Sequence, residues 1–368
     1  MEGIIQKYIN KNLEQSESWE ENVCRIVINR SDIYKSTIRS INRKKFSFFK
    51  PLSVTFSGEE AVDTGGPKRE YLRLLMQEVA TLKIFQNDWF KHDLIALNQN
   101  VYALVGQLIA WSILQGCSGP KCLSMSIYNF ISGKTVDDNL HQHIIDEDLK
   151  EILAVLNRTS NDESFNEFLD KYSDRICDYG YVNIYITKYG DKLDICNALL
   201  KHQFKFSVLA EIQQFKDGMN VIGNFGECIW NNNNVFESIL SDKQEDLTWQ
   251  KFKELFSNDY SEVGSNKRIV ENETIYSWEM FLQDVNEKEV DVKFGDLLIF
   301  ITGTNSIPPL GFTNKPCIGF YDLEIKERRL PWSSTCSNTL YLPRNVDPAM
   351  LKSMIIQSLL EGHGFGKV

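Results

Sequence analysis

The sequence lacks the clustered cysteines and histidines from which zinc sites are built. Its 368 residues include eight Cys and five His, and no two Cys form a Cys-x-x-Cys pair. His141 and His143 would share a face only in an extended strand, so a chance pair is the better interpretation. We therefore expect no metal and no cofactor. Scattered Cys of this kind are typical of a reducing compartment.

A surplus of positive charge and a long apolar run are also missing. The net charge of -10 argues against nucleic acid as a partner, because phosphates attract a basic surface. The longest apolar run, residues 101–114, contains Gln107 and Ser112 and is too short to cross a bilayer. The N-terminus has no apolar signal core. We expect a soluble intracellular protein, cytoplasmic or nuclear, that does not contact a membrane.

A phosphate-binding loop is excluded by charge. Gly65 and Gly66 form a sharp turn between a predicted strand at 52–56 and a predicted helix that begins near Pro67. The turn has no Gly-Lys-Ser/Thr, and the segment before it carries Glu59 and Asp63, which would repel phosphate.

The residues that are present suit an α+β protein of two domains. Hydrophobic residues make up 42% of the chain, which is ample for packed cores. Apolar spacing predicts a buried helix at 102–114, a helix at 201–215 that ends by Gly218, and a final helix after Asp347. Alternation predicts a strand at 181–187, and the apolar run 296–302 is interpreted as a buried strand.

One stretch, residues 330–343, combines a single Cys with small hydroxyl residues between two prolines. Proline fixes the backbone at both ends, and the Ser-Ser-Thr that precedes Cys336 cannot enclose a sulfur atom. We therefore expect the Cys336 thiol on a fixed loop, open to a large reaction partner. For an isolated Cys, an ordinary small apolar residue at a strand end would be the favoured interpretation.

The pattern Leu-Pro-x-x-x-Thr-Cys-x-Asn-x-Leu-x-Leu-Pro of this stretch resembles the active-site loop of HECT-type E3 ubiquitin ligases. A second segment, Phe56 to Tyr71, resembles the Gly-Glu…Asp-x-Gly-Gly-x-x-Arg-Glu motif near the start of HECT domains. Residues 296–304 together with 308–312 resemble a third family segment, Phe-Val-Thr-Gly…Pro-x-x-Gly-Phe. The resemblance covers about residue 20 to the end, and we interpret Asp63, Arg69 and Glu70 as structural residues.

The resemblance implies a mechanism and its site residues. Cys336 would accept ubiquitin from an E2 conjugating enzyme by transthiolation and pass it to a lysine of a protein substrate. Thr335 and Asn338 are expected to donate hydrogen bonds near the thiol, and Phe365 holds the place of the aromatic residue in the family's C-terminal tail.

The resemblance also implies a bilobal domain layout. After a polar helical extension at 1–19, a larger and mostly helical N-lobe would span 20–262, with an inserted small subdomain around 160–205 that docks the E2. A hinge would follow at 263–270, and a smaller α/β C-lobe at 271–368 would carry the catalytic loop and the tail. The small polar residues at 261–267 suit a linker that lets the C-lobe rotate.

Two alternatives stay open at this point. The family commonly has His two residues before the Cys and Phe directly after it, where this chain has Ser334 and Ser337. The loss of a polar partner and of an apolar anchor would suit a HECT-like binding module without productive transfer. A cysteine protease would need an oriented His, and after Cys336 the chain offers only His363.

Overall fold

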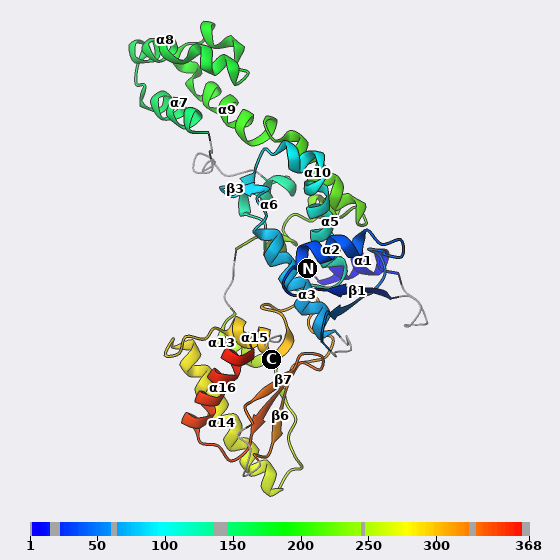
Figure 1. The fold of residues 1–368 in the computed structure, drawn as a ribbon. Helices are drawn as coiled ribbons and strands as arrows, with labels where there is room; N and C mark the ends of the chain where they lie inside the picture. The colour runs from blue at the N-terminus through cyan, green and yellow to red at the C-terminus, as the bar shows by residue number, and fades with distance from the viewer. Residues whose placement is uncertain are drawn as a thin grey trace. The chain divides into compact units, whose positions relative to one another are not determined.

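The computed structural model describes residues 2–14, 23–59, 65–134, 144, 146–243, 247–323 and 329–362. Helices and short strands alternate irregularly, which confirms the α+β class (Figure 1). The α-helices are α1 Glu2–Asn12, α2 Ile33–Ile41, α3 Gly66–Ala80, α4 Leu94–Asn98, α5 Val101–Leu114, α6 Met125–Ile131, α7 Glu147–Arg158, α8 Asp162–Asp178, α9 Lys192–Lys201, α10 Leu209–Val221, α11 Phe225–Asn231, α12 Glu237–Leu240, α13 Trp249–Leu255, α14 Asn266–Asn286, α15 Phe294–Thr302 and α16 Pro348–Gly362.

Three shorter helices and eight strands complete the described elements. Two are 3₁₀ helices, η2 Val182–Ile186 and η3 Tyr189–Asp191, and one is a π-helix, η4 His202–Phe206. The strands are β1 Cys24–Ile28, β2 Leu52–Phe56, β3 Phe85–Gln86, β4 Trp89–Phe90, β5 Ser257–Asn258, β6 Cys317–Tyr321, β7 Trp332–Ser334 and β8 Thr339–Pro343. No helix within the described ranges is long and apolar enough to cross a membrane.

The chain divides into two compact units. The first contains Met1–Val79, Trp111–Lys121 and Gln244–Val368, and the second contains Ala80–Ala110 and Cys122–Lys243. In the first unit, β1 and β2 pair in parallel over five residues, from Cys24 opposite Leu52 to Ile28 opposite Phe56. Both strands alternate buried and exposed residues, as expected for a sheet with one face in the core.

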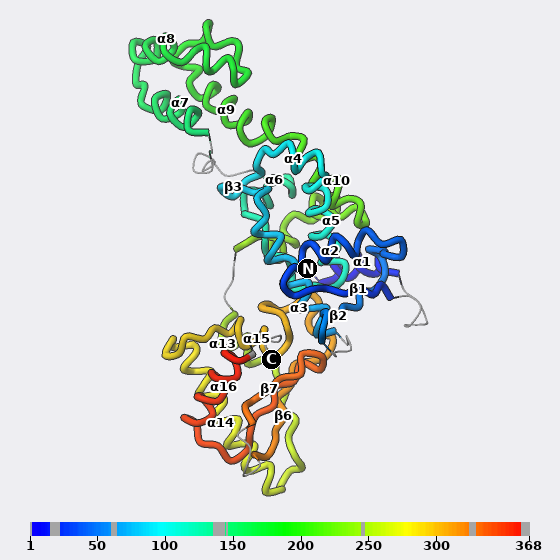
Figure 2. Tube along the Cα trace, in the orientation of Figure 1, coloured from blue at the N-terminus to red at the C-terminus, as the bar shows by residue number. Residues whose placement is uncertain are grey.

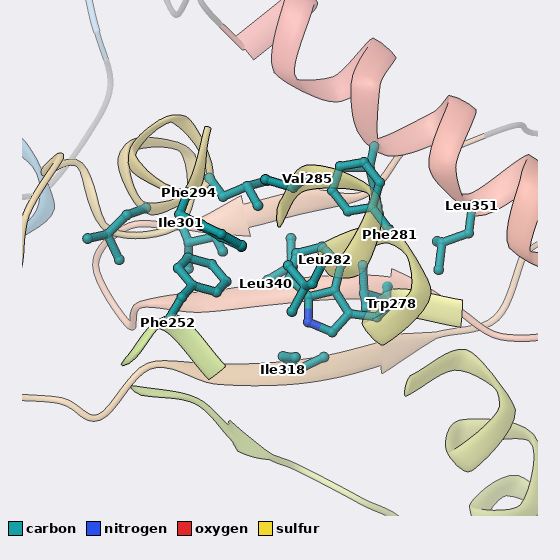
Figure 3. Close-up of a cluster of buried hydrophobic side chains, with 14 of the residues drawn as sticks. Phe252, Trp278, Phe281, Leu282, Val285, Phe294, Ile301, Ile318, Leu340 and Leu351 are labelled. Atoms are coloured by element: carbon teal, nitrogen blue, oxygen red, sulfur yellow. The ribbon is translucent and has the colours of Figure 1, made fainter. Parts of the chain in front are cut away.

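The C-terminal part of the first unit is built on a four-stranded sheet in the order β5-β6-β8-β7. Strand β8 pairs in parallel with β6 and antiparallel with β7. Helices α13, α14, α15 and α16 bury their apolar side chains against one another and the sheet. Figure 3 shows Trp278 and Leu282 of α14 beside Ile318 of β6 and Leu340 of β8. The same cluster includes Phe252 of α13, so this core begins before residue 263.

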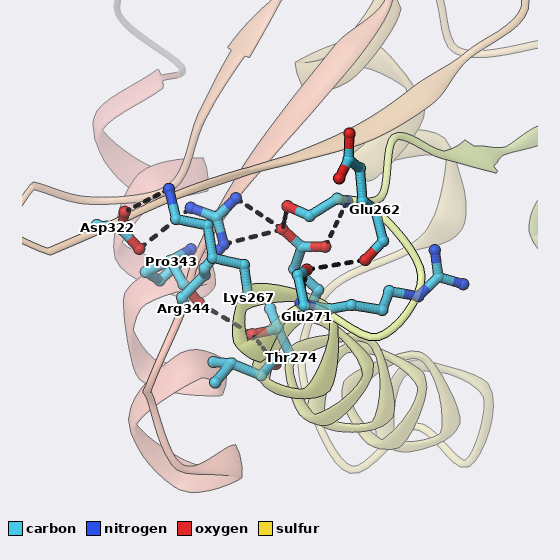
Figure 4. Close-up of polar contacts among 11 residues, drawn as sticks. Glu262, Lys267, Glu271, Thr274, Asp322, Pro343 and Arg344 are labelled. Carbon is cyan, nitrogen blue, oxygen red and sulfur yellow. Dashed lines mark hydrogen bonds and ion pairs between the residues drawn. The ribbon is translucent and has the colours of Figure 1, made fainter.

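A buried carboxylate joins the start of this region to the end of its central strand (Figure 4). Glu271 of α14 has no exposed surface, and it accepts hydrogen bonds from the Ser261 amide and hydroxyl at 2.7 and 2.6 Å. Arg344, directly after β8, pairs with Glu271 at 2.7 Å and with Asp322 at 3.1 Å. Burial alone would raise the pKa of Glu271, but the Ser261 and Arg344 contacts outweigh it and lower the pKa.

The contacts of Glu271 show how the chain packs next to the predicted hinge. Ser261 is bonded to the first turns of α14, and β5 already pairs with β6. The segment predicted as a hinge, 263–270, therefore has packed elements of the first unit on both sides of it in the sequence, while its own residues are exposed or half-buried. The chain passes from the second unit to the first between Lys243 and Gln244. Rotation about 263–270 stays a prediction.

The second unit is almost entirely helical. Helices α5 and α10 approach closely at two glycines, because a Cβ on Gly106 would overlap the Phe215 carbonyl and a Cβ on Gly218 would overlap the Ala103 carbonyl. Helix α10 therefore continues through Gly218 to Val221, where the sequence suggested an end. Helices α7, α8 and α9 form a separate group around buried residues such as Phe168 (Figure 2).

Two predicted strands are helices. Residues 296–302 belong to α15, because the Asp296 carboxylate accepts from the Lys293 amide at 2.9 Å and Gly303 ends the helix in a left-handed conformation with φ 81°. Its buried residues follow helical spacing once counting begins at Phe294. In the region predicted as a strand at 181–187, Ile184 of η2 is buried while Ile186 is exposed, although both would share one face of a strand.

The predicted polar helical extension at 1–19 contains helix α1. In the structure, Ile5 and Tyr8 of α1 are buried, so α1 packs one face against the protein. Predictions that fall on residues 363–368 lie outside the described residues.

We predict that Arg344→Ala lowers the free energy of unfolding by about 3–5 kcal/mol, because it leaves the Glu271 charge buried without its cation. Lys352→Ala is the matched control. It removes a half-buried ion pair with Asp284 and should cost no more than about 1 kcal/mol. Denaturant unfolding of both variants measures the difference, and similar costs for the two would contradict the prediction.

Candidate active site

Cys336 lies in the turn between β7 and β8. The two strands pair antiparallel, with Ser334 opposite Thr339 and Trp332 opposite Tyr341. The Trp332 and Tyr341 rings stack with centroids 4.0 Å apart, which holds the base of the hairpin. The predicted fixed loop is therefore a strand-bounded turn, and the extended segment that follows it is β8.

The thiol of Cys336 is half-buried and unbridged. Burial raises the pKa of the thiols of Cys117 and Cys196, which weakens them as nucleophiles at neutral pH. Among the cysteines, Cys336 combines partial exposure with a place in a turn. This combination suits a nucleophile that must meet a large partner.

Ser334 and Ser337 interact within the turn itself. The Ser337 amide donates to Ser334 Oγ at 3.4 Å, and the Ser337 hydroxyl donates to Thr339 Oγ1 at 3.0 Å. Ser337 is exposed. The two residues that depart from the usual family pattern thus contribute local hydrogen bonds to the turn, and Ser337 leaves the surface beside Cys336 uncrowded.

The side chain of Asn338 makes buried hydrogen bonds on both sides of the turn. Its side chain is 1% exposed, and Nδ2 donates to the Asn314 carbonyl at 2.7 Å. Its Oδ1 accepts from Arg69 Nη2 at 2.7 Å. The backbone is left-handed with φ 56°, a conformation that Asn tolerates better than most residues. Asn338 therefore fixes the shape of the turn, and a hydrogen bond from its amide to the thiol stays a prediction.

Thr335 meets the first turn of α3. Its carbonyl accepts from Arg69 Nη2, and its hydroxyl lies against Gly66, where a Cβ would stand 2.5 Å from Thr335 Oγ1. A hydrogen bond from this hydroxyl to the thiol stays a prediction. Phe365, the predicted tail residue, and His363 lie outside the described residues.

Ion pairs stabilise the N-terminal part of α3. Arg30 pairs with Glu59 and with Glu70, the latter at 2.7 Å, and lies over the Phe56 ring. Burial lowers the pKa of Arg30, but the hydrogen bonds to the two carboxylates outweigh burial and raise it overall. Glu70 is thus a structural ion-pair residue, as interpreted from the sequence, while Asp63 lies outside the described residues.

Arg69 has a structural role, as interpreted from the sequence, but the groups that it bonds could not be predicted. It lies 266 positions before Thr335, and its acceptors are mostly backbone carbonyls, which leave no trace in a sequence. The one available signal was the Gly65-Gly66 pair, since adjacent glycines indicate a close backbone approach as well as a turn.

The comparisons with known proteins agree with this geometry. A model of the HECT-domain (ubiquitin-transferase) family matches residues 69–368. The chain therefore belongs to the HECT-domain family, and the resemblance inferred from its motifs is confirmed.

Among curated proteins, the chain is similar to the G2/M phase-specific E3 ubiquitin-protein ligase of Homo sapiens, with 24% identity over 326 residues that cover 87% of this chain and 44% of the relative. The Gallus gallus protein of the same name is 26% identical, with 87% and 42% covered. The probable E3 ubiquitin-protein ligase mug30 of Schizosaccharomyces pombe is 24% identical, with 92% and 46% covered. The chain thus spans less than half the length of these relatives.

We predict that Asn338→Ala lowers the free energy of unfolding by about 1–3 kcal/mol, because it leaves the Asn314 carbonyl and Arg69 without this buried partner. Asn338→Gly should cost about 0.5–1 kcal/mol less than Asn338→Ala, because glycine adopts the left-handed backbone without strain. Denaturant unfolding tests the order of the two variants, and the reverse order would contradict a strained backbone at this position.

Proposed function

We propose that the chain is a HECT-type E3 ubiquitin ligase module that carries ubiquitin on Cys336. Family membership and the names of the relatives support ubiquitin transfer, and the half-buried thiol in a strand-bounded turn supports Cys336 as its carrier. The position of Cys336 is the observation that carries the proposal.

Two transfers would follow one another at this sulfur atom. In the first, the Cys336 thiolate attacks the E2–ubiquitin thioester, a new thioester forms on Cys336, and the E2 thiolate leaves. In the second, a neutral lysine amine of the substrate attacks the Cys336 thioester, an amide bond forms, and the Cys336 thiolate leaves. The first step exchanges like for like, so it needs positioning more than strong acid-base catalysis.

We predict that Cys336→Ala abolishes the reductant-sensitive ubiquitin adduct that the wild-type chain forms with a charged E2. Cys336→Ser should give an adduct that resists reductant, because an oxyester replaces the thioester. Gel analysis with and without dithiothreitol, against a panel of E2 enzymes, distinguishes these outcomes. Cys317→Ala is the control, since Cys317 is also a half-buried thiol of the same sheet.

The same assay separates a ligase from a HECT-like binding module. If a charged E2 binds the wild-type chain but no adduct forms, the binding module is correct and the ligase proposal is wrong.

The group formed by α7, α8, α9 and η2 is the proposed E2-docking surface, at the position of the predicted small subdomain. Three side chains of η2 project into solvent: Val182, Tyr185 and Ile186 are 69%, 62% and 79% exposed. A cavity of about 530 Å³ lies nearby, lined by residues that include Tyr181 and Phe206. Large apolar side chains gathered on one surface indicate a protein partner.

We predict that Ile186→Asp weakens binding of a charged E2 by about tenfold or more, because a carboxylate would be desolvated in an apolar contact. Val221→Asp is the matched control in the same unit. Val221 is 55% exposed on α10, and its substitution should change the dissociation constant by less than about twofold. Fluorescence titration measures both, and equal losses for the two variants would argue against this surface.

A further inference from the structure

The turn that carries Cys336 rests on the N-terminal end of α3 within the first unit. Arg69 donates through Nε to the Thr302 carbonyl at 2.9 Å, at the end of α15. Its Nη2 donates to the Thr335 carbonyl and to Asn338 Oδ1, on both sides of Cys336 in the sequence. One guanidinium thus joins the α15 end to the catalytic turn.

The geometry of these bonds matches arginine rather than lysine. The acceptors of Arg69 lie along two edges of a planar, rigid fork, and a lysine ammonium could reach one or two of them without the same fixed spacing. Asn338 is buried and is bonded on its other side to the Asn314 carbonyl, so it cannot follow Arg69 away from this position without losing a partner.

Gly66 makes the approach possible. A Cβ on Gly66 would stand 2.5 Å from Thr335 Oγ1 and 3.1 Å from the Cys336 amide nitrogen. The first distance is too short for a Cβ contact and the second is tight, so any other residue at this position would force Thr335 or the turn to shift. Arg73, one helical turn further along α3, donates to the Gly303 carbonyl at 3.2 Å and has no recorded bond to residues 335–338 in the part of the chain that the structure describes.

We propose that Arg69 is a positioning residue for the second transfer, the passage of ubiquitin from Cys336 to a lysine amine. The inference rests on the proposed function. In the first transfer, the E2 carries the thioester and the loop brings only a nucleophile. In the second, Cys336 itself carries the reacting carbonyl carbon. Any movement of the turn therefore moves this electrophilic carbon as well.

Chemistry makes the second transfer the more sensitive step. The lysine nitrogen attacks the carbonyl carbon, the C–S bond breaks, and the Cys336 thiolate takes up the proton that the amine releases, directly or through water. A displacement of the reacting carbon by about 1 Å can slow such a step by about a hundredfold. The Arg69 charge beside the Thr335 carbonyl also lies close to the turn where negative charge develops on the thioester oxygen.

The test separates the two transfers in single-turnover reactions. The wild-type chain is charged on Cys336 from an E2, further charging is stopped, and free lysine is added to discharge the thioester. For Arg69→Ala we expect charging within about twofold of wild type and discharge slowed by about tenfold or more. Arg69→Lys should discharge at an intermediate rate. Arg73→Ala, which removes a cation from the same helix, is the matched control and should discharge within about threefold of wild type.

A double-mutant cycle identifies the contact responsible. Asn338→Gly keeps the left-handed turn and removes the acceptor of Arg69, so the double variant Arg69→Ala/Asn338→Gly should discharge no more slowly than the worse single variant. Gly66→Ala should reproduce the Arg69→Ala profile by steric separation, with normal charging and slow discharge.

Each outcome decides the matter. If Arg69→Ala discharges at the wild-type rate or faster, or loses charging and discharge equally, or if the two single variants multiply in the double variant, Arg69 does not position the turn for this step. If the wild-type chain forms no adduct at Cys336, the proposed function itself fails, and this result is visible before any variant is compared.

Discussion

The site depends on one buried side chain in an unusual backbone conformation. Asn338 turns the chain between β7 and β8 with a positive φ, and its amide is bonded at both ends, to Asn314 on one side and to Arg69 on the other. Without these bonds, a two-stranded hairpin tip would have little to define its shape. Cys336 lies two residues before Asn338, so its position is set by the hydrogen bonds of Asn338 and not by contacts of the thiol itself.

A second constraint fixes the far end of the same strand. Arg344 follows β8 directly and is paired with Glu271, whose carboxylate also holds Ser261. Strand β8 is thus anchored by Asn338 at its start and by Arg344 at its end, while Leu340 and Leu342 bury its inner face in the core. A buried ion pair contributes little net stability over an apolar pair, but it specifies one arrangement because each partner is costly to leave alone.

The sequence predicted the α+β class and the family, because these depend on local patterns, while Cys336 as the reacting residue stays a prediction. It failed at residues 296–302 and 181–187, where short apolar runs fit a strand or a helix equally well and capping contacts decided the outcome. It assigned Arg69 a structural role but not its partners, since a side chain that bonds distant backbone carbonyls leaves no spacing to detect. The hinge at 263–270 rests on small polar residues and stays a prediction, and Phe252, before it in the sequence, belongs to the same buried cluster as residues of α14.

Ser334 and Ser337, the serines near Cys336, have a local structural role in the turn. A turn positioned by Asn338 and by α3 does not need an apolar anchor of its own, and Ser334 and Ser337 instead supply short-range hydrogen bonds within the turn. Thioester exchange between two thiols is close to thermoneutral and depends on geometry more than on a general base. Under the proposed function, the first transfer would therefore depend less on a His beside Cys336 than on how the turn is positioned.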